Sequence, residues 1–541
     1  MNEDKPIYIL PENTQRTLGK DAQRNNIMAA KIVADVVKST LGPKGMDKML
    51  VDSTGETIVT NDGVTILEEM EIEHPAAKMM VDIAKTQEQE VGDGTTTAAL
   101  LAGKLLEEAE ELLEKKIHAT VITKGYRLAA EEALKVLEEV ASPVEDQETL
   151  RQLAMTAMTG KGAEGQKEHL AGLLVQAVHQ VAEGKKVEIG DVKIEKVKGE
   201  RVEESSLVQG MVLDKERAHG DMPEKIEGAK ILLTDVALEL KQPEQEAKLS
   251  ITSPDELQRF IEHEEKSLKD LTDRIIGSGA NVVLCQKGID DVAQYYLAKA
   301  GLFACRRVPK SDLEKVARAT GGKIVSHLQD VREENFGAAE MVEEVKQGEE
   351  GMTFIRGCQN PRAVTLLLRG GTGHVVDEIE RAMQDALGDV VAAVRSGRVV
   401  AGGGAVEMSV SRRLRAFAKT LGGREQLAVE GFALALESIP EALAENAGMD
   451  PIDVLAELRQ RQEMGEARAG VNLFTEKVED TLAAGIVEPL KVKTQAVSSA
   501  AEVAQMILRI DDVLISRGGG GGVGSSGAIG GGMPPGMMGM D

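Results

Sequence analysis

The segment VGDGTTTAALLAG, residues 91–103, combines two flexible glycines, a carboxylate and three hydroxyls at the start of an apolar run. Gly92 and Gly94 allow a tight turn that exposes backbone N–H groups. The threonines that follow add hydroxyl donors where a helix is expected to begin, and the N-terminus of a helix binds anions. The chemistry that this pattern indicates is phosphate binding.

Asp93 is the unusual member of this segment. The P-loop pattern G-x-x-x-x-G-K-[ST] is missing, because no lysine follows the second glycine. A bare carboxylate would repel phosphate, whereas a carboxylate that holds Mg²⁺ would let the metal bridge phosphate oxygens. An ordinary turn with a threonine helix cap is the alternative, and it stays open on this stretch alone.

Three other glycine-containing segments could meet the same ligand. They are TLGPKG (residues 40–45), AMTGKG (157–162) and VVAGGGAVE (399–407). In the second, Lys161 stands between two glycines, where its ammonium could reach a phosphate. The glycines of the third would let a flat base lie against the backbone. Taken alone, the first segment is also typical of a plain helix stop.

Two carboxylates elsewhere in the chain are further candidates. Asp62 lies in TNDGVT, and Asp385 lies in the helical pattern IERAMQDALGD. By itself, Asp62 is better explained by an Asx-type turn in a hairpin. Asp385 alone would pass for a solvated carboxylate on a helix face.

The elements that must position these residues follow from hydrophobic spacing. The spacing of isoleucines and valines predicts a helix over residues 25–40, ended by Gly42 and Pro43. Residues 49–67 are typical of a β-hairpin. Helices are expected over 98–116 and 121–140.

The middle of the chain has a different pattern. Short apolar strands at 229–240, 280–286, 322–328 and 363–371 alternate with helices, which is typical of an α/β domain. Helices return after residue 376 and continue to about 509. The fold class is therefore multidomain, with α and α/β parts, and one helical domain is expected to be made from both chain ends with an α/β domain inserted into it.

Two segments outside this core are predicted to be unusual. Ser253 is a helix-cap candidate, Pro254 suits the first helical position, and Glu256 completes a capping box. The last 24 residues, 518–541, contain 12 of the 56 glycines of the chain and are predicted to be disordered.

Composition excludes several classes of protein. The 541 residues are enough for several domains. A net charge of −26 argues against nucleic acid as the main partner. The three cysteines, an odd number, lack metal-ligand spacing. No signal peptide and no apolar run of roughly 18 residues is found, so we expect a soluble, cytoplasmic protein with no membrane partner.

Seven segments together resemble the group II chaperonins in order and spacing. They are LGPKGMDKML, TNDGVTILEEM, VGDGTTTAALLAGKLL, TGKGAE, VVAGGGAVE, GIVEPLKVKTQAV and ILRIDDVLI. The resemblance runs from about residue 17 to the Gly/Met-rich tail. Local departures follow DKERAHGDMPEK and lie in QDALGDVVAAVRSG.

The resemblance implies a chaperonin fold of three domains. A helical equatorial domain would comprise 1–147 and 404–517, and a small intermediate domain 148–215 and 369–403. An α/β apical domain would comprise 216–368 and carry a helical protrusion, at about 241–276, that serves as a built-in lid.

The resemblance also assigns roles around ATP and Mg²⁺. Asp93 would hold the metal, and Asp62 and Asp385 would position and polarise the attacking water. Lys161 would sense the γ-phosphate, and Asp385 would reach the site only when the intermediate domain swings down. The remaining ATP contacts would be Leu41, Gly42 and Pro43 along the nucleotide, Gly94, Thr95, Thr96 and Thr97 around the phosphates, Gly402 and Gly403 near the adenosine, and Glu488 on the ribose.

The function implied is that of an ATP-dependent chaperone. It would enclose unfolded polypeptides in two stacked rings of identical or paralogous subunits, without a separate co-chaperonin lid. Two other functions stay open from the residues alone. One is a phosphotransferase or phosphatase with an aspartyl-phosphate intermediate, because aspartate can be a nucleophile. The other is a scaffold ring that does not hydrolyse ATP.

Overall fold

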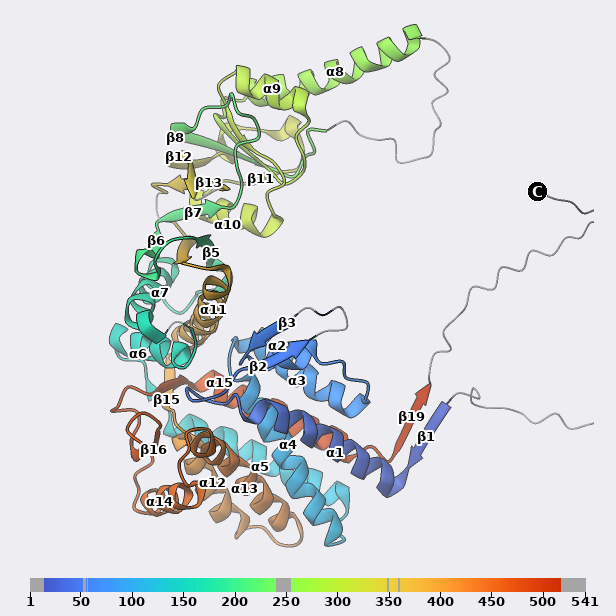
Figure 1. Ribbon diagram of the computed structural model, residues 1–541, viewed down its shortest axis with the longest axis vertical. Coiled ribbons are helices and arrows are strands. Elements are labelled where there is room, and N and C mark those ends of the chain that lie inside the picture. Colours follow the sequence, from blue (N-terminus) through green and yellow to red (C-terminus); the bar gives the residue numbers. More distant parts are fainter. Residues whose placement is uncertain are drawn as a thin grey trace, which may run out of the picture.

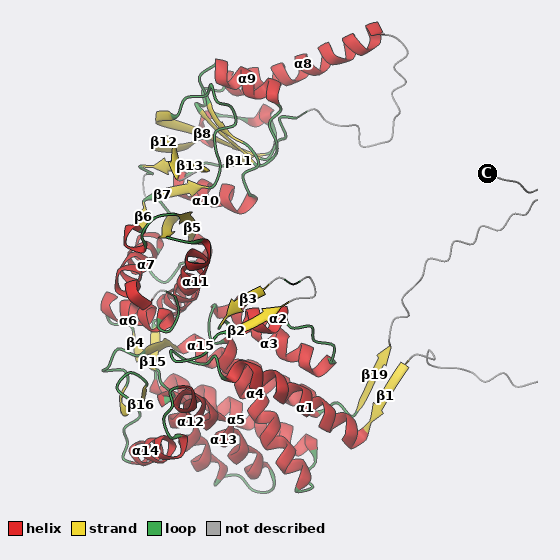
Figure 2. Ribbon diagram, in the orientation of Figure 1, coloured by secondary structure: helices red, strands yellow, loops and turns green. Residues whose placement is uncertain are grey.

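The molecule is elongated, with three regions stacked along its long axis (Figure 1). Figure 1 shows the computed structural model, which describes residues 14–51, 55, 57–162, 164–239, 254–347, 350–358 and 361–516. We call the three regions the base region (14–141 and 402–516), the middle region (142–209 and 361–401) and the upper region (210–358). Figure 2 shows that the base region is mostly helical, whereas strands gather in the upper region.

The base region is assembled from both parts of the described chain. Its N-terminal elements are β1 (Thr14–Leu18), α1 (Gly19–Lys38), β2 (Lys48–Val51), β3 (Thr57–Thr60), α2 (Gly63–Glu69), α3 (Pro75–Val91), α4 (Thr95–Glu114) and α5 (Ala119–Val140). Its C-terminal elements are α12 (Ala405–Ala418), α13 (Glu425–Asn446), α14 (Pro451–Glu463), β16 (Ala469–Asn472), β17 (Lys477–Asp480), β18 (Val487–Pro489), α15 (Leu490–Leu508) and β19 (Asp512–Ser516). β1 pairs with β19 in an antiparallel ribbon, so the two ends of this region lie side by side.

Small side chains allow the base helices to pack closely. A Cβ on Gly103 of α4 would lie only 2.3 Å from the Cβ of Ala34 on α1, so glycine is required for this approach. Two of the few aromatic residues, Tyr126 and Phe432, are fully buried in this core. Tyr126 and Phe432 meet edge to face at 5.6 Å, and the Tyr126 hydroxyl donates to the Leu105 carbonyl at 2.6 Å. A core made mainly of Ala, Val, Leu and Ile thus matches a chain with no tryptophan.

The middle region packs two helices, α7 and α11, on a small sheet, and a third helix, α6, packs on those two. Its elements are β4 (Ser142–Pro143), α6 (Gln147–Met158), α7 (Lys167–Val181), β5 (Val192–Lys198), β6 (Ser206–Val208), β14 (Val364–Gly370), α11 (Gly373–Ser396) and β15 (Arg398–Ala401). The sheet has the order β5-β14-β6. β15 pairs with β4 and with β18, and thereby joins the middle region to the base region.

The upper region is built around a seven-stranded mixed sheet with the order β10-β9-β8-β12-β13-β7, to which β11 adds by pairing with β8. Its elements are β7 (Gly210–Leu213), β8 (Lys225–Thr234), α8 (Pro254–Gly277), β9 (Val282–Cys285), α9 (Asp291–Lys299), β10 (Phe303–Cys305), α10 (Lys310–Thr320), β11 (Ile324–Val325), β12 (Gly337–Gln347) and β13 (Glu350–Arg356). α8 projects away from the sheet (Figure 1). No helix in the described parts of the chain combines the length and apolar character needed to cross a membrane.

Most predicted elements are present with shifted ends. The hairpin is confirmed as β2 and β3, but residues 63–67 of the predicted range form the start of helix α2 instead. The helix predicted from residue 98 already begins at Thr95. The predicted helix end at Gly42 is wrong: α1 ends at Lys38, Ser39 is its C-cap, and Gly42 adopts φ +82° in the loop beyond.

Strand pairing also refines the predicted domain organisation. β14, which the limit at 368 places mostly in the apical part, pairs with β5 and β6 of the middle region. β7, which precedes the limit at 215, pairs with β13 of the upper region. Isolated apolar runs look alike in sequence, so their spacing cannot tell which sheet they join. Ser253, the segment 240–253 and the tail 518–541 lie outside the described residues.

Candidate nucleotide site

A cavity of about 420 Å³ lies where the base and middle regions meet. Thirteen of the fourteen site residues predicted above line it, namely Leu41, Gly42, Pro43, Asp62, Asp93, Gly94, Thr95, Thr96, Thr97, Lys161, Asp385, Gly403 and Glu488. Gly402 is the exception. The fold therefore brings residues that lie more than 440 positions apart in the sequence, Leu41 and Glu488, to the same cavity.

The glycine-threonine segment forms the floor of this cavity. Gly94 is the N-cap of α4 with φ +81°, a left-handed conformation that favours glycine. A Cβ there would lie 2.6 Å from a methyl of Val492 on α15. The Gln87 side-chain amide fixes the turn by donating to the Asp93 carbonyl at 2.8 Å and to the Val492 carbonyl at 3.3 Å. The helix start is thus held with its free N–H groups toward the cavity.

The loop after α1 forms a second wall. The Asn446 amide donates to the Lys38 carbonyl at 3.0 Å and to the Leu41 carbonyl at 2.9 Å, which satisfies carbonyls at the end of α1. A Cβ on Gly160 would lie 2.4 Å from the Cα of Pro43. Glycine at 160 therefore allows the middle region to close against this loop.

Asp62 is held by a helix start. It is the N-cap of α2, and its Oδ2 accepts from the Thr65 N–H at 2.9 Å and from the Thr65 hydroxyl at 2.6 Å. The hairpin-turn interpretation is therefore wrong: Asp62 lies beyond β3 and caps a helix. A cap of this kind orients the carboxylate, which leaves the catalytic interpretation open. Its Oδ1 has no recorded hydrogen bond among the described residues.

Lys161 and Asp385 form an ion pair in the cavity, between the loop after α6 and helix α11. Burial alone would lower the pKa of Lys161, but Asp385 and Asp93 outweigh it and raise that pKa. Burial raises the pKa of Asp385 to about 6, against the opposing effect of Lys161. The expectation that Asp385 reaches the site only after a domain movement differs from this structure, where Asp385 already lines the cavity with Asp62 and Asp93.

Three acidic residues of the cavity, Asp389, Glu88 and Glu378, were missed in the sequence. Asp389 stands one helical turn after Asp385 and is 3% exposed, and its Oδ1 has no partner among the described residues. Burial raises its pKa well above the usual range. Burial, with the charges of Asp385, Asp62 and Asp93, raises the pKa of Glu88 to about 8. The spacing of four residues from Asp385 was the one signal in the sequence for Asp389. No sequence signal marks Glu88 as a cavity residue.

The end of the cavity where the adenosine and its ribose are expected, here called the ribose end, includes Gly403 and Glu488 of the base region. Gly402 does not line the cavity: its N–H bonds the Ile486 carbonyl at 2.9 Å, and its carbonyl accepts from Thr481 at 2.9 Å. Glu488 lines the cavity and pairs with the buried Lys493 at 2.5 Å. Lys493 was also missed, because nothing in its spacing distinguishes it from a surface lysine.

The charges that line the cavity fit a nucleotide bound together with a metal cation better than a nucleotide alone. Its lining includes seven carboxylates, which are Asp62, Glu88, Asp93, Glu378, Asp385, Asp389 and Glu488, and four cations, which are Lys161, Lys167, Arg381 and Lys493. A polyphosphate entering this excess of acid needs an accompanying cation. No group of three or more His, Cys, Asp or Glu in the described residues has the geometry of a complete metal site. Mg²⁺ is commonly held by only one or two carboxylates together with substrate phosphates, so Asp93 and the orphaned Asp389 oxygen fit this role.

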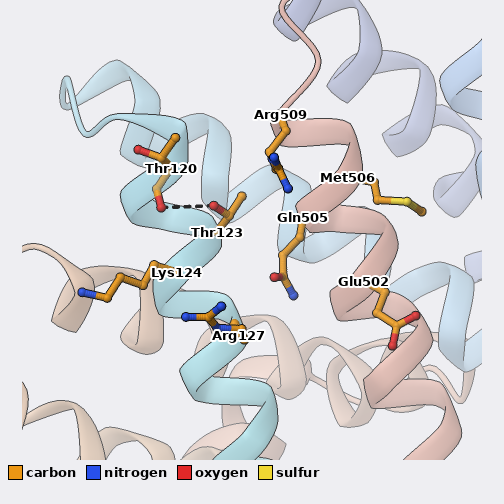
Figure 3. A pocket seen from close by; sticks show the side chains of 8 residues that line it. All are labelled: Thr120, Thr123, Lys124, Arg127, Glu502, Gln505, Met506 and Arg509. Atoms are coloured by element: carbon orange, nitrogen blue, oxygen red, sulfur yellow. Dashed lines mark hydrogen bonds between the residues drawn. The ribbon is translucent and has the colours of Figure 1, made fainter.

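A second hollow, of about 550 Å³, lies between α5 and α15 (Figure 3). Most of its lining side chains are exposed, and Glu502 is its only carboxylate. Lys124, whose side chain points away from α15 in Figure 3, is already paired with Glu425 at 2.8 Å. This hollow lacks both a glycine-rich helix start and paired carboxylates, so the cavity between the base and middle regions is the candidate site.

Comparisons with known proteins agree with this geometry. A sequence profile of the TCP-1/cpn60 chaperonin family matches residues 33–517. The chain is 58% identical to thermosome subunit beta of Archaeoglobus fulgidus over 96% of this chain and 98% of the relative. It is 57% identical to the thermosome subunit of Methanopyrus kandleri over 95% and 96%. An open-state monomer of a group II chaperonin from Methanococcoides burtonii superposes with a TM-score of 0.60 at 47% identity, covering 78% of this chain and all of that one.

The stacked regions and the cavity between them define a protein with the chaperonin fold. The chain belongs to the TCP-1/cpn60 chaperonin family, and within it to the group II chaperonins, as the sequence motifs predicted.

Proposed function

We propose that this protein is an ATP-dependent molecular chaperone that binds unfolded polypeptides and hydrolyses ATP in the cavity between the base and middle regions. The observation that carries the proposal is the Lys161–Asp385 pair, which faces the glycine-rich start of α4 across that cavity. A phosphate-binding helix start and a carboxylate poised in one cavity are what hydrolysis of a nucleotide phosphate requires.

Each side chain has a part in this chemistry. The N–H groups and hydroxyls at Gly94, Thr95, Thr96 and Thr97 would bind phosphate oxygens, and Lys161 would add a positive charge beside them. Asp62, oriented by Thr65, would position the attacking water. Asp385, with a pKa of about 6, is ionised at neutral pH and would accept the proton of that water.

Mg²⁺, when bound, would neutralise charge on the phosphates and activate them toward attack. Asp93 is the residue proposed to hold it. Leu41, Gly42, Pro43 and Gly403 would contact the rest of the nucleotide, and Glu488 would accept from the ribose hydroxyls.

The assembly belongs to the same proposal. Two stacked rings of identical or paralogous subunits would form a chamber in the cytoplasm, with no nucleic acid or membrane partner. The projecting helix α8 supports a built-in lid at about 241–276, which would replace a separate co-chaperonin. The equatorial, intermediate and apical domains would correspond to the base, middle and upper regions.

The test uses the purified full chain. Mg²⁺-dependent ATP hydrolysis and ATP-dependent recovery of a denatured reporter enzyme are expected, and electron microscopy is expected to show double rings. Absence of ATP turnover would leave a scaffold ring, and a stable covalent phospho-enzyme after acid quenching would favour the aspartyl-phosphate phosphotransferase.

A further inference from the structure

Glu488 at the ribose end belongs to a buried charge cluster of three residues. Lys493, in the first turn of α15, pairs with Glu488 at 2.5 Å and with Glu407 of α12 at 2.8 Å. The side chains of Lys493 and Glu407 are 6% and 5% exposed, whereas that of Glu488 is 25% exposed and lines the cavity. The cluster thus reaches from the interior of the base region to the cavity wall.

The two oxygens of Glu488 have different surroundings. Lys493 engages Oε2. Oε1 has no recorded hydrogen bond within the described part of the chain and lies over Gly402, where an added Cβ would be only 2.8 Å away. The Gly402 backbone is fixed by its bonds to Ile486 and Thr481, so it cannot easily retreat. Lys493 therefore holds Oε2 of the carboxylate, and the missing side chain of Gly402 leaves space for Oε1.

Lys493 is held in place by its two acidic partners. Burial alone would lower its pKa, but Glu407 and Glu488 outweigh burial and raise that pKa, so the ammonium stays charged. A buried cation with two acidic partners is strongly restrained, because leaving either partner unpaired in the interior is costly. Glu407 anchors the lysine, and the lysine anchors Glu488.

We propose that Lys493 is a positioning residue for nucleotide binding: it holds Oε2 of Glu488 so that Oε1 is presented to the ribose hydroxyls, and it thereby sets the preference for ribonucleotides. The inference rests on the proposed ATP site. Gly402, which lies behind the wall, takes the role of making room for this carboxylate.

The experiment compares ATP with 2′-deoxy-ATP and 3′-deoxy-ATP as substrates. Lys493→Met, alone and combined with Glu407→Gln to avoid an unpaired buried carboxylate, should raise the KM for ATP about tenfold, the size of one hydrogen bond to a charged acceptor. The KM of the disfavoured deoxynucleotide should change little, and kcat should stay within about twofold. Glu488→Gln should do the same, and combining it with Lys493→Met should add nothing further.

Two further variants keep the test decisive. Gly402→Ala leaves both ion pairs in place but crowds Oε1, and it should reduce ribose preference even if the lysine variants fold poorly. Arg415→Met removes a cation, 2.6 Å away, from Glu437, a buried glutamate that does not line the cavity. It should leave the ratio of KM values unchanged.

Three results would overturn the inference: equal use of all three nucleotides by the wild type, an unchanged KM ratio in both the Lys493 and the Gly402 variants, or additive effects of Lys493→Met and Glu488→Gln. A wild type that does not turn over ATP at all would instead overturn the proposed function.

Discussion

The two ends of the cavity are built in different ways. At the phosphate end, the base region supplies Asp62 and the start of α4, and the middle region supplies Lys161 and Asp385. At the ribose end, Glu488 and its partners Lys493 and Glu407 all belong to the base region. The side chains of one end come from two regions and those of the other from one, although Glu488 stands on β18, whose backbone pairs with β15 of the middle region.

This difference separates binding from hydrolysis. Groups held within one packed region keep their geometry when the regions move, so the ribose end suits nucleotide binding in every state. Groups from two regions act together only when those regions are in contact, so the phosphate end suits coupling of hydrolysis to movement. Variants at the two ends should accordingly change different kinetic constants.

The largest effect is expected at Asp385. Asp385→Asn removes the proposed base and should lower kcat about 10²- to 10⁴-fold while changing the KM for ATP little. Asp377→Asn, on the same helix but paired with Lys196 outside the cavity, is the control. Steady-state ATP hydrolysis measures both, and an equal loss of ATP binding in Asp385→Asn would contradict the division between the two ends.

Asp93 should behave in the opposite way. Asp93→Ala removes the proposed metal ligand and should weaken Mg·ATP binding about tenfold to a hundredfold, the usual range for disturbed metal sites. Titration of ATP binding at several Mg²⁺ concentrations measures this, with the exposed Asp82→Asn of α3 as control. A lowered kcat with unchanged binding would show that Asp93 does not hold the metal.

Gly388 of α11 tests the contact between the regions itself. A Cβ there would lie 2.7 Å from the Val91 carbonyl and 3.1 Å from the Cα of Gly92, so the helix rests directly on the phosphate loop. Gly388→Ala should raise helix propensity yet lower kcat about tenfold, because a shift of the order of an ångström in the positioning of Asp385 is costly.

Gly172→Ala is the matched control for that substitution, since it lies in a helix of the same region with nothing within 4 Å of the added Cβ. It should keep the wild-type kcat. A fully active Gly388→Ala would mean that the close approach of α11 does not position Asp385.

Some residues of the cavity could be predicted from local sequence patterns, and others could not. The loop at Gly92 and Gly94 was predicted from local chemistry alone, because glycines and hydroxyls at a helix start have a recognisable pattern. The flanking glycines singled out Lys161, but placing it with Asp385 in one site needed the family resemblance, since no local pattern joins residues more than 200 positions apart. Asp389 and Lys493 look like ordinary helical charges in sequence, and only burial in the folded chain gives them a place in the site.

The regions follow the same rule. Periodicity predicted helices at both ends and an α/β pattern between them, and the fold agrees. It did not predict that β14 joins β5 rather than the upper sheet, because strand partners depend on long-range packing. The predicted cap at Gly42 was wrong because the Asn446 side chain, from a helix 400 residues away, completes the end of α1 instead.

The smallest effect concerns Glu88, which lies at the phosphate end. In the native state its pKa is about 8, compared with an ordinary value of 4.5. Between those values the native protein binds more protons than the unfolded chain, so the free energy of unfolding falls as pH rises from about 4.5 through about 8. Glu88→Gln does not titrate, and should become more stable than the wild type by about 2 kcal/mol above pH 8, discounted from the full shift because the group is only partly buried.

Calorimetric unfolding of the nucleotide-free protein at pH 5.5 and 8.5 measures this difference. Glu90→Gln, exposed near the end of the same helix, should track the wild type at both values. A stability gain of equal size at both pH values would mean that the crowding of carboxylates at the phosphate end does not strain Glu88. A gain that appears only at high pH would show that the phosphate end stores unfavourable charge at Glu88.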